Sequence, residues 1–185
     1  MENNVQNFIV ISGGPGSGKS TLIDALERQG FARSIEAGRA IIRHQMRIGG
    51  TALPWIDRAL FAELMLCWEM RSYDLAQQND GPVFFDRSVP DVIGYLTLCG
   101  LPVPAAMEEA ARVFRYNKTV FLAPPWLEIF AQDSERKQDF AEAVRTFEAM
   151  EKTYLSYGYE VALLPKASVE KRVDFITQKI SSVFR

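Results

Sequence analysis

The stretch that decides the fold is Gly13-Gly14-Pro15-Gly16-Ser17-Gly18-Lys19-Ser20. It fits the phosphate-binding pattern G-x-x-x-x-G-K-[ST], known as the P-loop. The mostly apolar residues 8–12 before it predict a buried parallel strand, and residues 20–27 after it predict the first turns of a helix. A glycine loop between a strand and a helix is the context in which this motif cradles phosphate.

Each part of this loop has a physical role. Glycines let the backbone curl so that successive N–H groups point at phosphate oxygens, and the helix that follows adds the positive end of its dipole. We expect Lys19 to contact the β- and γ-phosphates of ATP and the Ser20 hydroxyl to bind Mg²⁺. The residues expected to bind the nucleotide are Gly14, Gly16, Ser17, Gly18, Lys19, Ser20 and Thr21.

Length and composition restrict the class of protein. A chain of 185 residues, 48% of them hydrophobic, suits one globular domain over residues 1–185. The net charge of −2 gives no sign of a general nucleic-acid binder. Cys67 and Cys99 lie in apolar stretches, so we expect small core residues in a reducing compartment. No signal-peptide pattern or membrane-length apolar run is present, which favours a cytoplasmic protein without a membrane span.

Strands and helices alternate along the chain. Strands are expected at residues 8–12, 31–35, 83–85, 119–122 and 160–164, and the helices after the P-loop helix at 37–48, 55–78, 90–99, 104–116, 140–157 and 168–183. Short strands separated by helices predict an α/β fold with a parallel sheet covered by helices on both faces. Ligands in such sheets bind beyond the carboxyl ends of the strands.

Asp86 and Arg87 follow the third predicted strand and should therefore lie at the same sheet edge as the P-loop. We expect the Asp86 carboxylate to act in catalysis and to hold Mg²⁺, the alternative being an acid that only caps a turn or helix. Arg87 suits bidentate contact with a substrate anion. A salt bridge that orders the strand end is an equal alternative for Arg87.

Two further groups are candidates for substrate contacts. Glu36 ends the second predicted strand and Arg39 follows on a helix, so both could bind a phosphoryl acceptor, or they could form an ordinary surface pair. Residues 126–139 carry mixed charge and could form a lid. Arg136 would then reach the transferring phosphoryl group, unless this segment is only a charged helix start.

These motifs together resemble a known family: small AAA-domain proteins whose fold is that of P-loop kinases. The matching residues are Gly13 to Ser20, Glu36 with Arg39, Asp86-Arg87-Ser88, Pro124-Pro125-Trp126, and Asp133 with Arg136. The chain is also similar, more loosely, to nucleoside monophosphate kinases and to the nicotinamide riboside kinase domain. The resemblance implies a three-layer P-loop NTPase with strand order 2-3-1-4-5 that binds ATP and Mg²⁺. Hydrolytic AAA ATPases usually carry a Glu after the metal-binding Asp, where this chain has Arg87.

The function expected from these residues is ATP-dependent phosphoryl transfer to a small acceptor, such as a nucleoside, a nucleotide or another metabolite. Lys19 and Arg136 would neutralise the phosphoryl group, while Glu36, Arg39 and Arg87 would bind the acceptor. The alternative is a regulatory ATPase with slow hydrolysis that signals to a protein partner. A GTP-dependent switch has less support, because Asn117-Lys118 is not followed by the Asp of the guanine-binding motif.

Overall fold

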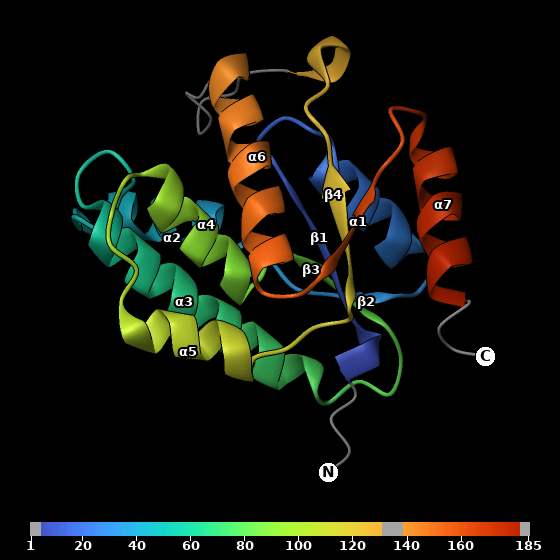
Figure 1. Ribbon diagram of the computed structural model, residues 1–185, viewed down its shortest axis with the longest axis horizontal. Coiled ribbons are helices and arrows are strands. Elements are labelled where there is room, and N and C mark those ends of the chain that lie inside the picture. The colour runs from blue at the N-terminus through green and yellow to red at the C-terminus, as the bar shows by residue number, and fades with distance from the viewer. Residues whose placement is uncertain (1–4, 131–138, 182–185) are drawn as a thin grey trace.

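The computed structural model describes residues 5–130 and 139–181 (Figure 1). Its centre is one sheet of five parallel strands in the order β2-β3-β1-β4-β5. The strands in this order are Ala32–Arg33, Val83–Asp86, Phe8–Gly13, Thr119–Ala123 and Glu160–Leu163. This order confirms the fold class expected from the sequence.

Helices cover both faces of the sheet (Figure 1). The helices are α1 (Lys19–Arg28), α2 (Ala37–Ile48), α3 (Arg58–Ala76), α4 (Val89–Leu98), α5 (Ala105–Val113), α6 (Phe140–Ser156) and α7 (Val169–Ser181), with 3₁₀ turns at Val5–Asn7 and Leu127–Ile129. Side chains alternate across a strand, so β1 supplies both cores. Ile9 and Ile11 pack with α1 and α7, whereas Phe8 and Val10 pack with the helices of the other face.

Several sequence-based expectations differ from the structure. The second strand, β2, is shorter than the expected 31–35, so Glu36 does not end this strand and is instead the N-cap residue of α2. Helix α3 begins at Arg58 rather than at residue 55, because the Asp57 carboxylate caps it by accepting a hydrogen bond from the Leu60 N–H at 2.9 Å. The cysteines are not core residues: Cys67 is exposed and Cys99 is half-buried. The apolar neighbours of Cys67 in sequence belong to other faces of the same helix, so the composition of the stretch misplaced it.

The pairing of β1 with β3 sets where Asp86 and Arg87 lie relative to the P-loop. Ile11 lies opposite Asp86 in the parallel register, and the Arg87 N–H donates to the Ile11 carbonyl at 3.2 Å. The last residues of β3 therefore lie directly beside the start of the P-loop. This is the sheet edge at which Asp86 was expected.

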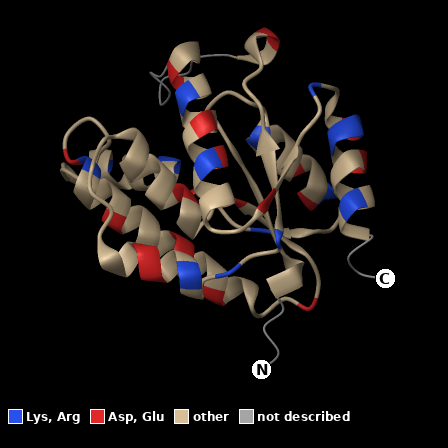
Figure 2. Cartoon of the chain, viewed as in Figure 1, with Lys and Arg blue, Asp and Glu red and all other residues tan. Residues whose placement is uncertain are grey.

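Charged residues of both signs are interspersed along α5, α6 and α7, as Figure 2 shows, rather than gathered by sign. This pattern fits the small net charge of the chain. None of the helices in the described residues is both long and apolar enough to cross a membrane.

Phe84 tests how much the fold depends on the face that α1 and α7 cover, since it is fully buried there. We expect Phe84→Ala to lower the free energy of unfolding by about 3–5 kcal/mol. Urea denaturation followed by circular dichroism measures this change. The control is Leu75→Ala on α3, where the side chain is 44% exposed. Equal losses in the two variants would contradict this description of the core.

Candidate functional site

The P-loop joins β1 to α1 and requires glycine at particular positions. Gly18 has φ +78°, and a Cβ there would lie 2.8 Å from the Arg172 guanidinium. Gly14 has no room either, because a Cβ would lie 2.3 Å from the Ala143 carbonyl oxygen on α6. The loop backbone is therefore held closely by α6 and α7, and larger side chains would displace it.

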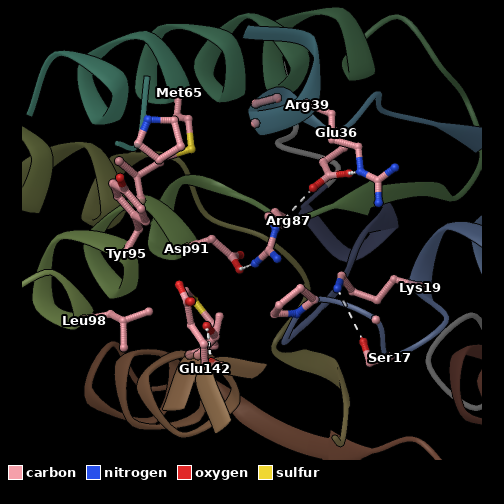
Figure 3. A pocket seen from close by; sticks show the side chains of 18 of the residues that line it. Ser17, Lys19, Glu36, Arg39, Met65, Arg87, Asp91, Tyr95, Leu98 and Glu142 are labelled. Atoms are coloured by element: carbon pink, nitrogen blue, oxygen red, sulfur yellow. Dashed lines mark hydrogen bonds and ion pairs between the residues drawn. The ribbon is translucent and has the colours of Figure 1, made fainter. Parts of the chain in front are cut away.

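Lys19 is buried at the first position of α1, and its ammonium points back over the loop (Figure 3). It donates to the Gly14 carbonyl at 2.7 Å and lies 3.4 Å from the Ser17 hydroxyl. Burial, followed by the nearby charge of Arg87, lowers the pKa of Lys19 to about 8. A buried ammonium with carbonyl and hydroxyl partners is an anion-binding group whose charge is poorly compensated.

A cleft of about 620 Å³ runs from the P-loop past the ends of the strands to a space between α3, α4 and α6. The predicted nucleotide and substrate residues that line it are Gly16, Ser17, Gly18, Lys19, Ser20, Thr21, Glu36, Arg39 and Arg87. Two predicted residues, Gly14 and Asp86, lie beneath this surface rather than on it. Among the described residues, the structure thus brings the predicted groups to one site.

Asp86 ends β3 and is only 5% exposed. Its backbone N–H donates to the Ser34 hydroxyl at 3.1 Å, but its side-chain Oδ1 atom is buried without a hydrogen-bond partner among the described residues. Burial and then the charge of Glu36 raise the pKa of Asp86 to about 6. The charges of Lys19 and Arg87 act in the opposite sense but do not cancel this shift. A buried carboxylate with an unpartnered oxygen beside a phosphate-binding loop is a fitting ligand for a cation.

Arg87 occupies the centre of the site, between two acids (Figure 3). Its guanidinium lies 3.2 Å from Asp91 and 3.9 Å from Glu36, and Glu36 lies 3.4 Å from Arg39. Burial opposes the charge of Arg87, but Asp91 and Glu36 together raise its pKa. Arg87 thus forms salt bridges, the alternative to substrate contact considered from the sequence, and they hold its guanidinium in the cleft.

The backbone of Arg87 is unusual. It is the one described non-glycine residue with a positive φ, at 74°. This conformation costs about 1–3 kcal/mol and is concentrated at functional sites. The turn that requires it directs the chain from β3 into α4 and aims the Arg87 side chain at the cleft.

Asp91 anchors this arrangement and was not predicted from the sequence. It accepts hydrogen bonds from the Ser12 hydroxyl on β1, the Tyr154 hydroxyl on α6 and the Ser88 N–H, the last at 3.0 Å. The Ser88-x-x-Asp91 spacing at a helix start is a capping pattern that could have identified it. Asp91 thereby ties β1, α4 and α6 together behind Arg87.

The far half of the cleft contains side chains that sequence reasoning also missed. Glu69 of α3 is only 2% exposed, and its Oε2 atom is buried without a partner among the described residues. The Tyr95 hydroxyl of α4 is likewise buried, and the weakly hydrogen-bonding Cys99 thiol is its one side-chain partner among the described residues. Further lining residues are Trp55, Arg58, Phe61, Met65, Val92, Leu98, Cys99, Glu142, Arg145, Thr146 and Met150.

Arg172 on α7 supports the P-loop from behind and is 2% exposed. Its guanidinium donates to the Ser17 carbonyl at 3.2 Å, and burial lowers its pKa. The sequence offered no signal for it beyond its place on the last helix. A buried cation this close to the loop adds to the positive potential at Gly18.

The proposed lid lies mostly outside the described residues, and so do Asp133 and Arg136. The part of the segment that precedes them rests on the P-loop. The Phe130 ring occupies the space where a Cβ on Gly16 would lie, 2.5 Å away, and it packs on Phe140 at 5.5 Å between centroids. Ile129 lines the cleft.

In the described part of the chain, no group of three or more His, Cys, Asp or Glu side chains could hold a metal ion by itself. A Mg²⁺ site of the P-loop kind does not need such a group, because phosphates and water supply most of the ligands. Ser20, which is exposed in the cleft, and the unpartnered Asp86 Oδ1 are the protein atoms that fit.

The fold and the loop geometry together define a P-loop nucleotide-binding protein. The chain belongs to a family of AAA domains, whose model matches residues 8–172. This match covers every described element except the 3₁₀ turn at Val5–Asn7 and the later part of α7.

Solved structures of similar shape include a nucleoside kinase. The chain is similar to deoxyadenosine kinase from M. mycoides with bound dATP, with TM-score 0.60 and 14% identity over 94% of this chain and 98% of that one. The same enzyme with products dCMP and a flexible dCDP matches with TM-score 0.62 and 13% identity over 94% and 100% of the chains. At these identities the likeness shows the fold. No curated protein matches the sequence.

The buried Glu69 carboxyl gives a pH dependence of stability. Burial, then the charges of Asp91 and Asp86, raise the pKa of Glu69 well above its ordinary value of 4.5, although Arg87 opposes this shift. The folded state therefore keeps a proton that the unfolded chain releases, so stability falls as pH rises above about 4.5.

We expect Glu69→Gln to remove this loss, because the amide cannot ionise. The variant should match the wild type in urea denaturation near pH 4 and be the more stable protein at pH 8. The control Glu63→Gln changes an exposed acid on the same helix and should follow the wild-type profile. Parallel pH profiles for wild type and Glu69→Gln would contradict the assignment.

Proposed function

We propose that this protein is an ATP-dependent kinase that transfers a phosphoryl group to a small acceptor, and that residues 1–185 act as one nucleotide-binding domain. The observation that carries the proposal is the cleft, which continues from the P-loop past Arg87 into a second space between α3, α4 and α6. A donor site with an adjoining, partly apolar pocket suits transfer to a bound molecule. The similarity of fold to deoxyadenosine kinase supports this reading.

The donor half binds ATP. Backbone N–H groups of residues 14–20 surround the phosphates, and Lys19 exchanges its carbonyl partners for the β- and γ-phosphate oxygens. Ser20 and Asp86 would hold Mg²⁺, which would supply neutralisation of phosphate charge when bound. Arg172 keeps the loop in place through the Ser17 carbonyl.

The acceptor half positions a hydroxyl for attack. The buried Asp86 carboxylate orients this hydroxyl as well as the metal, and a pKa near 6 suits transient contact with its proton. Arg87 is held between Glu36 and Asp91. The part of its guanidinium that these acids do not contact binds an anionic group of the substrate. Glu36 and Arg39 contact the acceptor from the start of α2.

Positive charge on the lid side completes the site. Arg136 is the proposed lid residue, and Arg145 of α6 lines the same cleft from the described part of the chain. Both would balance charge on the phosphoryl group during transfer. Closure over the triphosphate would exclude water and thus favour the acceptor over hydrolysis.

A regulatory ATPase is the alternative, and membership of an AAA-domain family is the observation that favours it. The two functions predict different dependence on an acceptor. ADP release that rises with nucleosides, nucleotides or other hydroxylated metabolites supports the kinase. Slow ADP release that no such compound changes, but a protein partner does, supports the regulator.

Asp86→Asn tests the central assignment. We expect transfer to fall by at least 100-fold, because the neutral amide no longer holds the metal, on the scale of electrostatic catalytic groups. Binding of ATP measured without metal should change little, since the P-loop is intact. The matched control is Asp80→Asn in the exposed turn before β3. Full transfer activity in Asp86→Asn would refute the role.

A further inference from the structure

The far half of the cleft has a polar atom that no described residue satisfies. Among the described residues, Glu69 Oε2 is buried without a hydrogen-bond partner, and the buried Tyr95 hydroxyl, on another helix that lines the same cavity, has only the Cys99 thiol as a side-chain partner. A buried polar group left unpaired costs about 1–3 kcal/mol, so an unpaired carboxyl oxygen in a pocket indicates a group that a ligand satisfies.

Apolar and aromatic side chains form much of the wall around these atoms, and the charged Arg58, Glu142 and Arg145 also line the cleft. Phe61 and Tyr95 meet edge to face with ring centroids 5.6 Å apart, and Met65, Leu98 and Val92 line the same space. Figure 3 shows Met65 and Tyr95 at the end of the cleft away from Lys19, with Arg87 between. Such walls suit a flat ring, which gains contact area and stacking without exposing polar atoms to hydrocarbon.

The electrostatic environment of Glu69 determines which edge of a ligand ring would face it. Ionisation of Glu69 is disfavoured by the charges of Asp91, Asp86 and Glu36. Of the charges that act on Glu69, Arg87 alone favours its ionisation. The local potential is therefore negative, so a ligand hydrogen with partial positive charge is preferred there. A carboxyl oxygen retains lone pairs to accept such a hydrogen.

We propose that the acceptor is a nucleoside-like molecule with an amino-substituted nitrogen heterocycle, and that Glu69 Oε2 accepts a hydrogen bond from its amino group. This inference rests on the proposed kinase function, which it deepens by naming the substrate class. Tyr95 makes a second contact with the ring substituents. The sugar hydroxyl then extends along the cleft towards Asp86 and the P-loop.

The test uses binding, so that it does not depend on turnover. Calorimetry on the full chain with a non-hydrolysable ATP analogue compares cytidine with its analogue lacking the amino group, and adenosine with purine riboside. We expect one amino nucleoside to bind at least 10-fold more tightly than its partner. Equal affinity within both pairs, or no binding of any of them, overturns the proposal.

Variants then locate the preference at Glu69. Glu69→Leu removes the acceptor atom and should abolish the preference, whereas Glu69→Gln keeps a carbonyl oxygen and should retain part of it. Glu63→Gln, on the exposed side of α3, should bind as the wild type does. Circular dichroism confirms that each variant folds. An undiminished preference in Glu69→Leu overturns the assignment.

The two proposals fail in different ways. If the amino preference depends on Glu69 but no phosphoryl transfer occurs, the recognition stands and the kinase function does not. If transfer occurs to a compound without a heterocycle while both nucleoside pairs fail to bind, the kinase function stands and this inference is wrong.

Discussion

The arrangement of the site depends on the ion pairs of Arg87. This guanidinium joins Glu36 at the start of α2 to Asp91 in the first turn of α4, and Asp91 is in turn bonded to Ser12 and Tyr154. A single half-buried cation thus connects both flanks of the cleft to the central strand. Removing Arg87 leaves the buried Asp91 carboxylate without its cationic partner, which is more destabilising than losing a surface pair.

The polar groups of the cleft are held under unfavourable conditions. Asp86 and Glu69 have raised pKa values because they are buried, and the ammonium of Lys19 has a lowered one for the same reason. Arg87 adds a backbone conformation that non-glycine residues rarely adopt. Such groups lower the stability of the folded state, and this loss is common at sites that are organised to bind charge.

The fold, and the residues proposed for the P-loop side of the site, could be predicted from the sequence. The P-loop and Asp86-Arg87 each follow a predicted strand, and ligands bind at the carboxyl ends of parallel strands, so both could be placed at one edge of the sheet. The structure has them at that edge. Glu69 has no such pattern. Helix α3 carries apolar residues on several faces, so its sequence does not distinguish Glu69 from acids that face solvent. Only the packing of α4 and α6 shows that Glu69 is enclosed.

The half-buried position of Cys99 gives the cleft a natural chemical reporter. Its thiol lines the cavity near Tyr95, whereas Cys67 is exposed on the outside of α3. Burial raises the pKa of the Cys99 thiol, which slows but does not prevent alkylation. The rate at which a small reagent alkylates Cys99, measured relative to Cys67 in the same molecule, therefore records occupancy of the pocket without an engineered reporter residue.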